Sequence, residues 1–216
     1  MNASPRLAII HTTPATIDSL GRLCASLLPR VKVNHYLDDS ILQQINAEGR
    51  ISPACRYRSF ALLQVAAAAK PDAILSACSS VGELLEEARD ICPMLLVRID
   101  EPMAREAAAR PGSIVVCATV PSTLGPTTAL IRRYAAGQTI DTLLIAEAGP
   151  LLARGDREAY LAAIAARLDE AAAGHDTVVL AQASMAAALD RVPWEKHSRF
   201  LTSPESGIRG LRSIFG

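Results

Sequence analysis

The sequence predicts an α/β protein built from two pseudo-symmetric, Rossmann-like α/β/α domains with mainly parallel sheets. Short apolar runs alternate along the chain with longer segments of helical periodicity, and this alternation favours parallel strands with helices on both faces of each sheet. A weak internal repeat supports two units, because DAILSACSSV from Asp72 aligns with DTVVLAQASM from Asp176. Ligands of such sheets bind at the carboxyl ends of the strands, so an interdomain cleft is expected to hold the functional site.

The apolar runs are predicted to be strands that are covered on both faces, since they are almost continuously apolar. In chain order they span residues 6–11, 31–36, 72–77, 94–99, 113–119, 141–147 and 176–182. The segments between them have helical spacing and end at proline or glycine breakers. The predicted helices cover residues 14–29, 56–70, 81–91, 103–110, 122–137 and 156–174.

The repeat divides the chain into a first domain at 1–98 and a second domain at 99–190. The tail, 191–216, is amphipathic, and it is expected to return and pack on the first domain. Two stretches, 36–55 and 146–156, are interpreted as loops that shape the pocket.

Composition excludes several classes of function. Half of the residues (50%) are hydrophobic and 20% are charged, with 22 basic and 22 acidic side chains, which is typical of globular proteins. The balanced charge gives no footprint for nucleic acid. No apolar run approaches the roughly 20 residues of a membrane helix, so no membrane partner and a cytoplasmic location are expected. The 5 cysteines lack metal-ligand spacing and there is no glycine-rich phosphate loop, so neither a metal nor a cofactor is expected.

Cys78 is the candidate catalytic residue. It lies at the carboxyl end of a predicted strand, one residue before a predicted helix. The positive end of the helix dipole is expected to lower the pKa of the thiol there. Ser79 and Ser80 follow it and can donate hydrogen bonds to a substrate carboxylate. The alternative is an inert buried cysteine, which is common in protein interiors.

Polar residues at the equivalent strand ends are candidates for substrate binding. His11, Thr12 and Thr13 end the first strand; the threonines are candidate carboxylate ligands, and His11 is a possible acid or base. In the second unit Thr119 and Thr123 take the corresponding place, and Ser184 follows residue 182. Helix capping is the competing interpretation of the hydroxyls, and a structural role is the competing interpretation of the histidine.

The LSACSS segment around Cys78 and the VVLAQASMA segment around Gln182 resemble the two cysteine motifs of the aspartate/glutamate/hydantoin racemase superfamily. The resemblance implies two α/β domains, each with a cysteine at the same edge, and a pair of thiols on opposite faces of the substrate α-carbon. Here the position of the second cysteine is taken by Gln182. An amide has no pKa near neutrality, so it cannot exchange a proton with the α-carbon. Gln182 would then orient a substrate carbonyl or carboxylate by hydrogen bonding.

The resemblance implies a cofactor-independent isomerase, of the racemase, epimerase or cis-trans isomerase type, that acts on a small carboxylic or amino acid through one thiol. Two alternatives stay open: a decarboxylase-like lyase in which Cys78 protonates an enediolate, and a catalytically inactive homologue that binds a small molecule. The resemblance also implies a homo-oligomer.

Overall fold

Two four-stranded parallel sheets, one in each of two structural units, organise the chain. The computed structural model describes residues 4–135 and 137–216. Unit 1 runs to Ile99 and includes Pro204–Gly216, and unit 2 is Asp100–Ser203. Residues 1–3 of the predicted first domain and Ala136 of the predicted helix 122–137 lie outside the described residues. The expected α/β fold with parallel sheets is confirmed, whereas the interdomain cleft stays a prediction.

The sheet of unit 1 has the strand order β2-β1-β3-β4. Its strands are β1 (Arg6–His11), β2 (Lys32–Leu37), β3 (Ala73–Ser76) and β4 (Leu95–Arg98). In register, Leu7 of the central strand pairs with Val33 on one side and Ala73 on the other. The strands are linked by α1 (Ile17–Leu27), α2 (Asp39–Glu48), α3 (Pro53–Ala68) and α4 (Gly82–Glu87), with 3-10 turns η1 (Pro14–Thr16), η2 (Ser79–Val81) and η3 (Ala88–Asp90).

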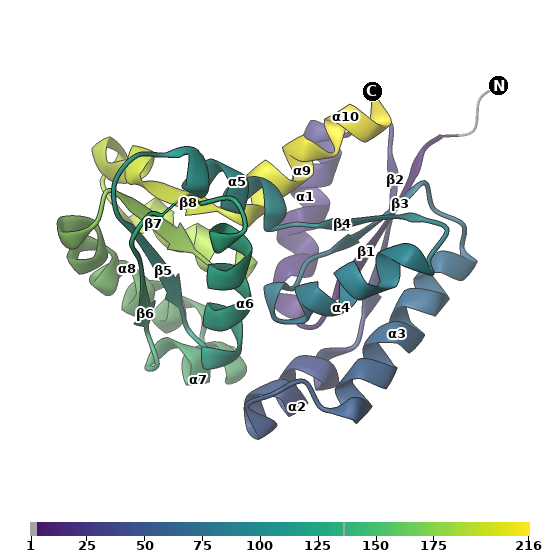
Figure 1. Cartoon of the computed structure of the whole chain (residues 1–216), viewed down its shortest axis with the longest axis horizontal. Coiled ribbons are helices and arrows are strands. Elements are labelled where there is room, and N and C mark those ends of the chain that lie inside the picture. The colour runs from purple at the N-terminus through teal and green to yellow at the C-terminus, as the bar shows by residue number, and fades with distance from the viewer. Residues whose placement is uncertain (1–3, 136) are drawn as a thin grey trace. The chain divides into compact units, whose positions relative to one another are not determined.

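Both faces of the inner strands β1 and β3 are covered, which is why these two strands are almost continuously apolar. The edge strand β2 is not covered on both faces as expected, because it alternates exposed and partly buried residues. Leu7 and Ile9 pack with Leu20 of α1, whereas Ala8 and Ile10 pack with Leu63 of α3. The C-terminal helices α9 (Ser203–Gly210) and α10 (Arg212–Phe215) return to the α1 face, as expected from the amphipathic tail (Figure 1).

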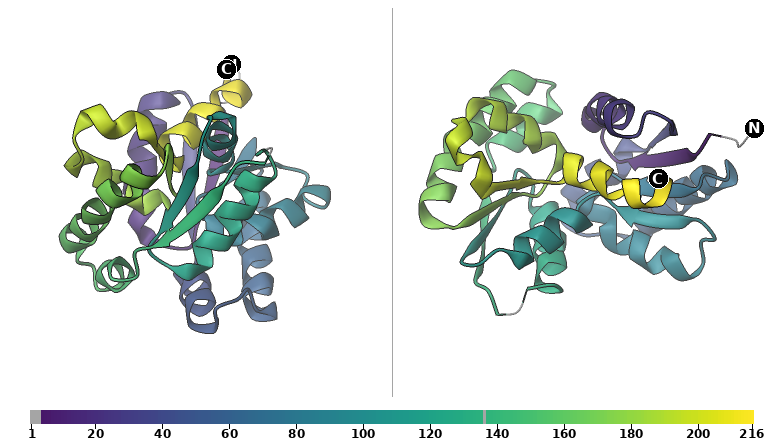
Figure 2. Two further views of the ribbon diagram at one scale, coloured as in Figure 1. Left: turned by 60° about the vertical axis from the view of Figure 1, so that its left-hand side comes forward. Right: turned by 90° about the horizontal axis from the view of Figure 1, so that it is seen from above.

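The sheet of unit 2 repeats this arrangement with the strand order β6-β5-β7-β8. Its strands are β5 (Ile114–Ala118), β6 (Ile140–Leu144), β7 (Thr177–Leu180) and β8 (Phe200–Thr202). Helices α5 (Glu101–Ala109) and α6 (Pro121–Arg132) cover one face and α8 (Arg157–Gly174) covers the other, where the short α7 (Ala148–Ala153) precedes it (Figure 2). The 3-10 segments η4 (Ala183–Arg191) and η5 (Trp194–Arg199) lead to β8.

The internal repeat is visible in the hydrogen bonds that begin each sheet. The Asp72 carboxylate accepts a hydrogen bond of 2.7 Å from the backbone N–H of Arg6, before β1 and β3 pair. The Asp176 carboxylate accepts one of 2.8 Å from the backbone N–H of Ser113, before β5 and β7 pair. The two aligned aspartates therefore do the same structural work in the two units.

Three details of the predicted organisation differ from the structure. The stretches 36–55 and 146–156, interpreted as loops, contain α2 and α7. Helix α2 forms because Asp38 caps it by accepting from the backbone N–H of Ser40, while Ile41 and Ile45 bury one face. Residues 191–203 belong with unit 2 and not with the tail, because β8 extends the second sheet by pairing with β7. Within residues 4–135 and 137–216, no helix is long and apolar enough to cross a membrane.

Candidate functional site

Cys78 lies where the central strands of unit 1 end. β1 and β3 are adjacent and parallel, so the residues after them, Thr12 and Ala77–Cys78, meet at one edge of the sheet. The backbone N–H of Ala77 donates to the carbonyl of Ile10 at 2.9 Å, which continues the ladder up to the cysteine. Cys78 itself is extended, with φ −129° and ψ 114°, and the η2 turn begins at Ser79. The strand-edge rule therefore places the thiol as expected.

Four hydrogen-bond donors surround the sulfur of Cys78. They are the hydroxyls of Thr12 and Ser80 and the backbone N–H groups of Ser80 and Val81, and each lowers the pKa of the thiol. The Thr12 hydroxyl is buried and has no partner at full hydrogen-bond geometry among the described residues, so its proton is available to the nearby sulfur. Such donors stabilise a thiolate more than a thiol.

Burial nevertheless raises the pKa of Cys78 above its ordinary value, because desolvation is the largest influence and outweighs the four hydrogen bonds. The expected lowering by a helix dipole is therefore wrong for the free protein. The reason is structural: a single 3-10 turn and the six-residue α4 follow the sulfur, and so short a helix carries a weak dipole. In the free protein the side chain is a neutral thiol that is poised to be stabilised as an anion.

The other shifted cysteines lack this set of donors. Burial raises the pKa of Cys24 to about 11, and it raises that of Cys117 to about 12 against the charge of Arg167. Both are buried in the cores, whereas Cys78 is partly exposed. The inert interpretation fits these two cysteines, and the hydrogen-bonded environment separates Cys78 from them.

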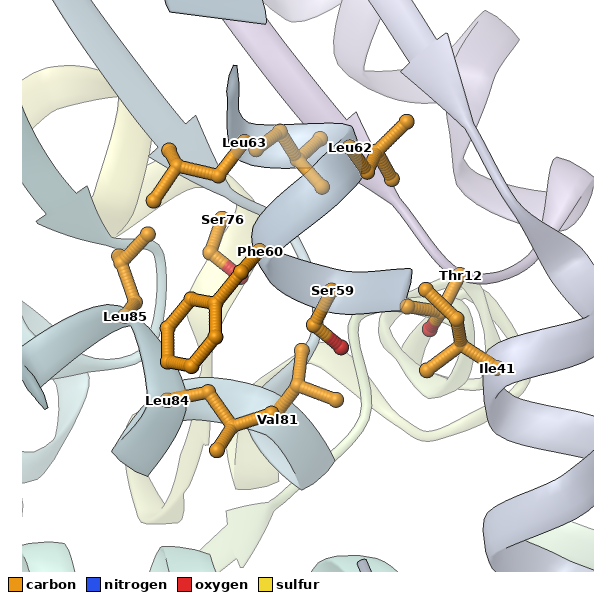
Figure 3. Close-up of a pocket in the computed structure, with 11 residues that line it drawn as sticks. Thr12, Ile41, Ser59, Phe60, Leu62, Leu63, Ser76, Val81, Leu84 and Leu85 are labelled. Atoms are coloured by element: carbon orange, nitrogen blue, oxygen red, sulfur yellow. The ribbon is translucent and has the colours of Figure 1, made fainter. Parts of the chain in front are cut away.

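A small apolar pocket lies next to Thr12 (Figure 3). Most of its lining consists of apolar side chains from α3, η2 and α4, and Thr12 reaches it from the end of β1. These apolar side chains are Phe60, Leu62, Leu63, Val81, Leu84 and Leu85. Its volume of about 20 Å³ suffices for one water molecule. Cys78 is not among its lining side chains.

His11 is buried, and both of its ring nitrogens have protein partners. Nδ1 lies 2.9 Å from the Thr16 hydroxyl, and Nε2 lies 2.9 Å from Nδ1 of His35. Desolvation, with a smaller contribution from His35, lowers the pKa of His11 to about 4. The side chain alternates with Thr12 and sits on the α1 face of the sheet. This geometry favours the structural role over the acid or base role.

At the equivalent edge of unit 2, Thr119 holds Gln182. The backbone N–H of Thr119 donates to Oε1 of Gln182 at 2.6 Å, and its hydroxyl donates to the same oxygen at 2.9 Å. The backbone N–H of Ala181 donates to the carbonyl of Cys117 at 2.9 Å, as Ala77 does to Ile10 in unit 1. Thr12 with Cys78 and Thr119 with Gln182 are therefore equivalent pairs in the two units.

Tyr160 belongs to this second cluster, although the sequence pattern of helix 156–174 indicates only a cover for the sheet. Its hydroxyl lies 2.8 Å from the Ser184 hydroxyl and neighbours the Thr119 side chain. Burial raises the pKa of Tyr160. The signal that could have found it is a lone tyrosine on the apolar face of a long helix, because a buried tyrosine hydroxyl nearly always has a partner.

The remaining candidates serve mainly local structure or lie within the core. Thr13 caps η1 by accepting from the backbone N–H of Ala15, as the capping interpretation expects. Ser79 and Thr123 are buried, with exposed fractions of 7% and 2%. Among the residues that the structure describes, no group of three or more histidine, cysteine, aspartate or glutamate side chains could hold a metal ion.

The comparisons with known proteins agree with this architecture. The family model described as Asp/Glu/Hydantoin racemase matches residues 9–196. A search of curated protein sequences finds no match. Among solved structures, Picrophilus torridus aspartate racemase is similar at a TM-score of 0.76 and 14% identity, over 98% of this chain and 94% of that one. Allantoin racemase from Klebsiella pneumoniae is similar at 0.66 and 17% identity, over 98% and 87%. Glutamate racemase from Thermus thermophilus is similar at 0.66 and 15% identity, over 98% and 80%.

Proposed function

The chain belongs to the Asp/Glu/Hydantoin racemase family, a family of isomerases, and we propose that it acts without a cofactor on a small carboxylic or amino acid through the thiol of Cys78. The observation that carries the proposal is the set of donors from Thr12, Ser80 and Val81 around this sulfur. The solved structures that resemble the chain are named for glutamate, aspartate and allantoin, which makes these compounds the first substrates to test.

The raised pKa of Cys78 leaves a small thiolate fraction, which the four donors stabilise. The thiolate takes the proton from the substrate α-carbon, and the electron pair of the broken C–H bond stays on the substrate as a carbanion conjugated with its carboxylate or carbonyl group. The thiol formed in this step exchanges its proton with solvent and donates a proton back to the same carbon. Cys78 therefore serves as acid and as base on one face of the substrate.

Gln182 at the second position favours chemistry on one face, because an amide cannot replace a second thiol. This observation supports a second candidate function, a decarboxylase-like lyase. In that reaction the C–C bond to the departing carboxylate breaks, its electron pair forms an enediolate, and CO₂ leaves. Cys78 then donates its proton to the carbon and becomes a thiolate.

The test incubates the protein with each enantiomer of glutamate, aspartate and allantoin in deuterated water. The proposal predicts deuterium at the α-carbon, measured by NMR, with no release of CO₂; CO₂ from a malonate-type diacid would instead identify the lyase. Cys78→Ser should reduce exchange at least 100-fold, and the matched control Cys92→Ser should not change it. Exchange that survives in Cys78→Ser would contradict the proposal.

Gln182→Cys separates a competent enzyme from an inactive homologue. A thiol at this position would lie beside the N–H and hydroxyl of Thr119, which stabilise a thiolate. We expect this variant to interconvert enantiomers faster than the wild type, as followed by chiral chromatography. If neither protein exchanges the α-proton of any tested compound, the binding homologue becomes the better interpretation.

A further inference from the structure

The side-chain amide of Gln182 has a fixed polarity. A backbone N–H can only donate, so the Gln182 atom that lies 2.6 Å from the Thr119 nitrogen must be the oxygen. The Thr119 hydroxyl, at 2.9 Å from the same oxygen, must also donate. Nε2 then lies on the other side of the amide, and it has no partner within residues 4–135 and 137–216. A half-buried NH₂ group with two unused donors is suited to bind an acceptor.

A chain of hydroxyls behind Thr119 maintains this polarity. Because the Thr119 hydroxyl uses its proton on Gln182, it can only accept from the neighbouring Tyr160 hydroxyl. When the tyrosine proton points to Thr119, the serine donates the hydrogen bond of 2.8 Å between Tyr160 and Ser184. All three hydroxyl residues are buried, at 3% for Thr119, 0% for Tyr160 and 8% for Ser184. Aligned hydrogen bonds of this kind strengthen one another.

We infer that Thr119, Tyr160 and Ser184 are positioning residues that hold Gln182 with its amide nitrogen turned outward, so that this strand edge binds a carboxylate or carbonyl oxygen of the ligand. The inference rests on the proposed function only for the identity of the ligand, which is a small carboxylic or amino acid. In unit 1 the equivalent threonine, Thr12, donates to a sulfur. In unit 2 the oxygen of Gln182 accepts from the equivalent threonine hydroxyl, and the side chain changes from a proton-transfer group to a specificity-determining donor.

The first test measures how the Thr119 donors change the pKa of a carboxyl group placed at position 182, and it needs no ligand. Gln182→Glu places a carboxylate where the amide oxygen lies, and ¹³C NMR gives the pKa of this introduced carboxyl group in labelled protein. Adding Thr119→Val removes the hydroxyl donor, and we expect the pKa of the introduced carboxyl group to rise by about one unit. Tyr160→Phe in the same background should raise it by less. Thr127→Val is the matched control, because the Thr127 hydroxyl is also buried in unit 2 but has no hydrogen-bond partner there; it should not shift this pKa.

An unchanged pKa of the introduced carboxyl group on adding Thr119→Val would overturn the inference. If Thr119→Val does not fold, Tyr160→Phe decides the question in the same way, since its ring is retained. Thr119→Ser restores a hydroxyl donor and should return the pKa to the Gln182→Glu value, which a merely structural role of Thr119 would not predict.

The second test asks whether the outward amide nitrogen of Gln182 binds a carboxylate. It measures the affinity for glutamate and aspartate by calorimetric titration at pH 8. Gln182→Glu should weaken binding at least tenfold, because it replaces two donors by a negative charge, and Tyr160→Phe should weaken it about threefold. Thr127→Val should bind like the wild type. Equal affinities for wild type and Gln182→Glu, or no binding of either amino acid to the wild type, would overturn the carboxylate assignment. If Cys78→Ser loses α-proton exchange but still binds the amino acids, the results support both the proposed function and the role of Gln182. If Cys78→Ser keeps α-proton exchange, only the proposed function is rejected.

Discussion

Buried His11, in contact with the more exposed His35, makes unit 1 sensitive to acid. His11 has no exposed surface, and its pKa is lowered from 6.5 to about 4, mainly by desolvation. The unfolded chain therefore binds this proton more tightly than the folded chain does. Stability from this residue is complete above about pH 6.5, falls as the pH decreases through the window to about 4, and is lost below it.

The size of the effect follows from the width of that window. A difference of about 2.5 units between the two pKa values corresponds to at most about 3 kcal/mol of unfolding free energy. Nε2 of His11 and Nδ1 of His35 lie 2.9 Å apart, and a hydrogen bond between them has room for one proton. Protonation of both rings would place a proton on each of these nitrogens. The pKa of His35 is lowered as well, by desolvation against the charge of Asp18.

The assay is urea unfolding followed by far-ultraviolet circular dichroism at pH 7.5 and pH 4.5. His11→Gln keeps a polar side chain that does not titrate, so it should lose about 2 kcal/mol less than the wild type does between the two pH values. His197→Gln in unit 2 is the control and should keep the wild-type loss. Equal losses for wild type and His11→Gln would refute this account of buried His11.

Two substitutions test the packing that positions Cys78. A Cβ at position 82 would lie 2.3 Å from Cζ of Arg98, whose buried guanidinium pairs with Glu86 at 2.6 Å. Gly82→Ala should therefore lower the free energy of unfolding in urea by about 1–3 kcal/mol. An unchanged free energy of unfolding would contradict the close approach. Ile208 of the returning tail is fully buried with α1, so Ile208→Ala should destabilise unit 1 by about 2–5 kcal/mol, whereas a value near zero would show that the tail does not pack there.

The sheets were predictable because burial on both faces leaves a continuous apolar run, as in Leu7–Ile10 and Val178–Ala181. Strand β8 was missed because its three residues are too short to show any period. Helix α2 was missed because it buries only Ile41 and Ile45 among polar neighbours. Its amphipathic signal is therefore weak over one short segment.

For the candidate site, the strand-edge rule placed Thr12 with Cys78 and Thr119 with Gln182, since adjacent parallel strands end together. The direction of the Cys78 pKa was not predictable in the same way. It depends on the balance between desolvation and four hydrogen bonds, and tertiary packing alone determines that balance. Tyr160 reaches Ser184 from a helix distant in sequence, so its role also required the folded chain.

Alkylation of Cys78 tests the central claim most directly, because the account depends on a reachable sulfur whose charge is stabilised by Thr12. The measurement is the rate of iodoacetamide labelling of each cysteine between pH 7 and 10.5, by mass spectrometry, in the native wild type and in Thr12→Val. We expect Cys78 to react in the native protein with a midpoint above that of an ordinary thiol, and Thr12→Val should move the midpoint higher without changing the rate at Cys92. A Cys78 that resists labelling, as we expect of the buried Cys24 and Cys117, or whose midpoint is unchanged by the loss of the Thr12 hydroxyl, would contradict the account.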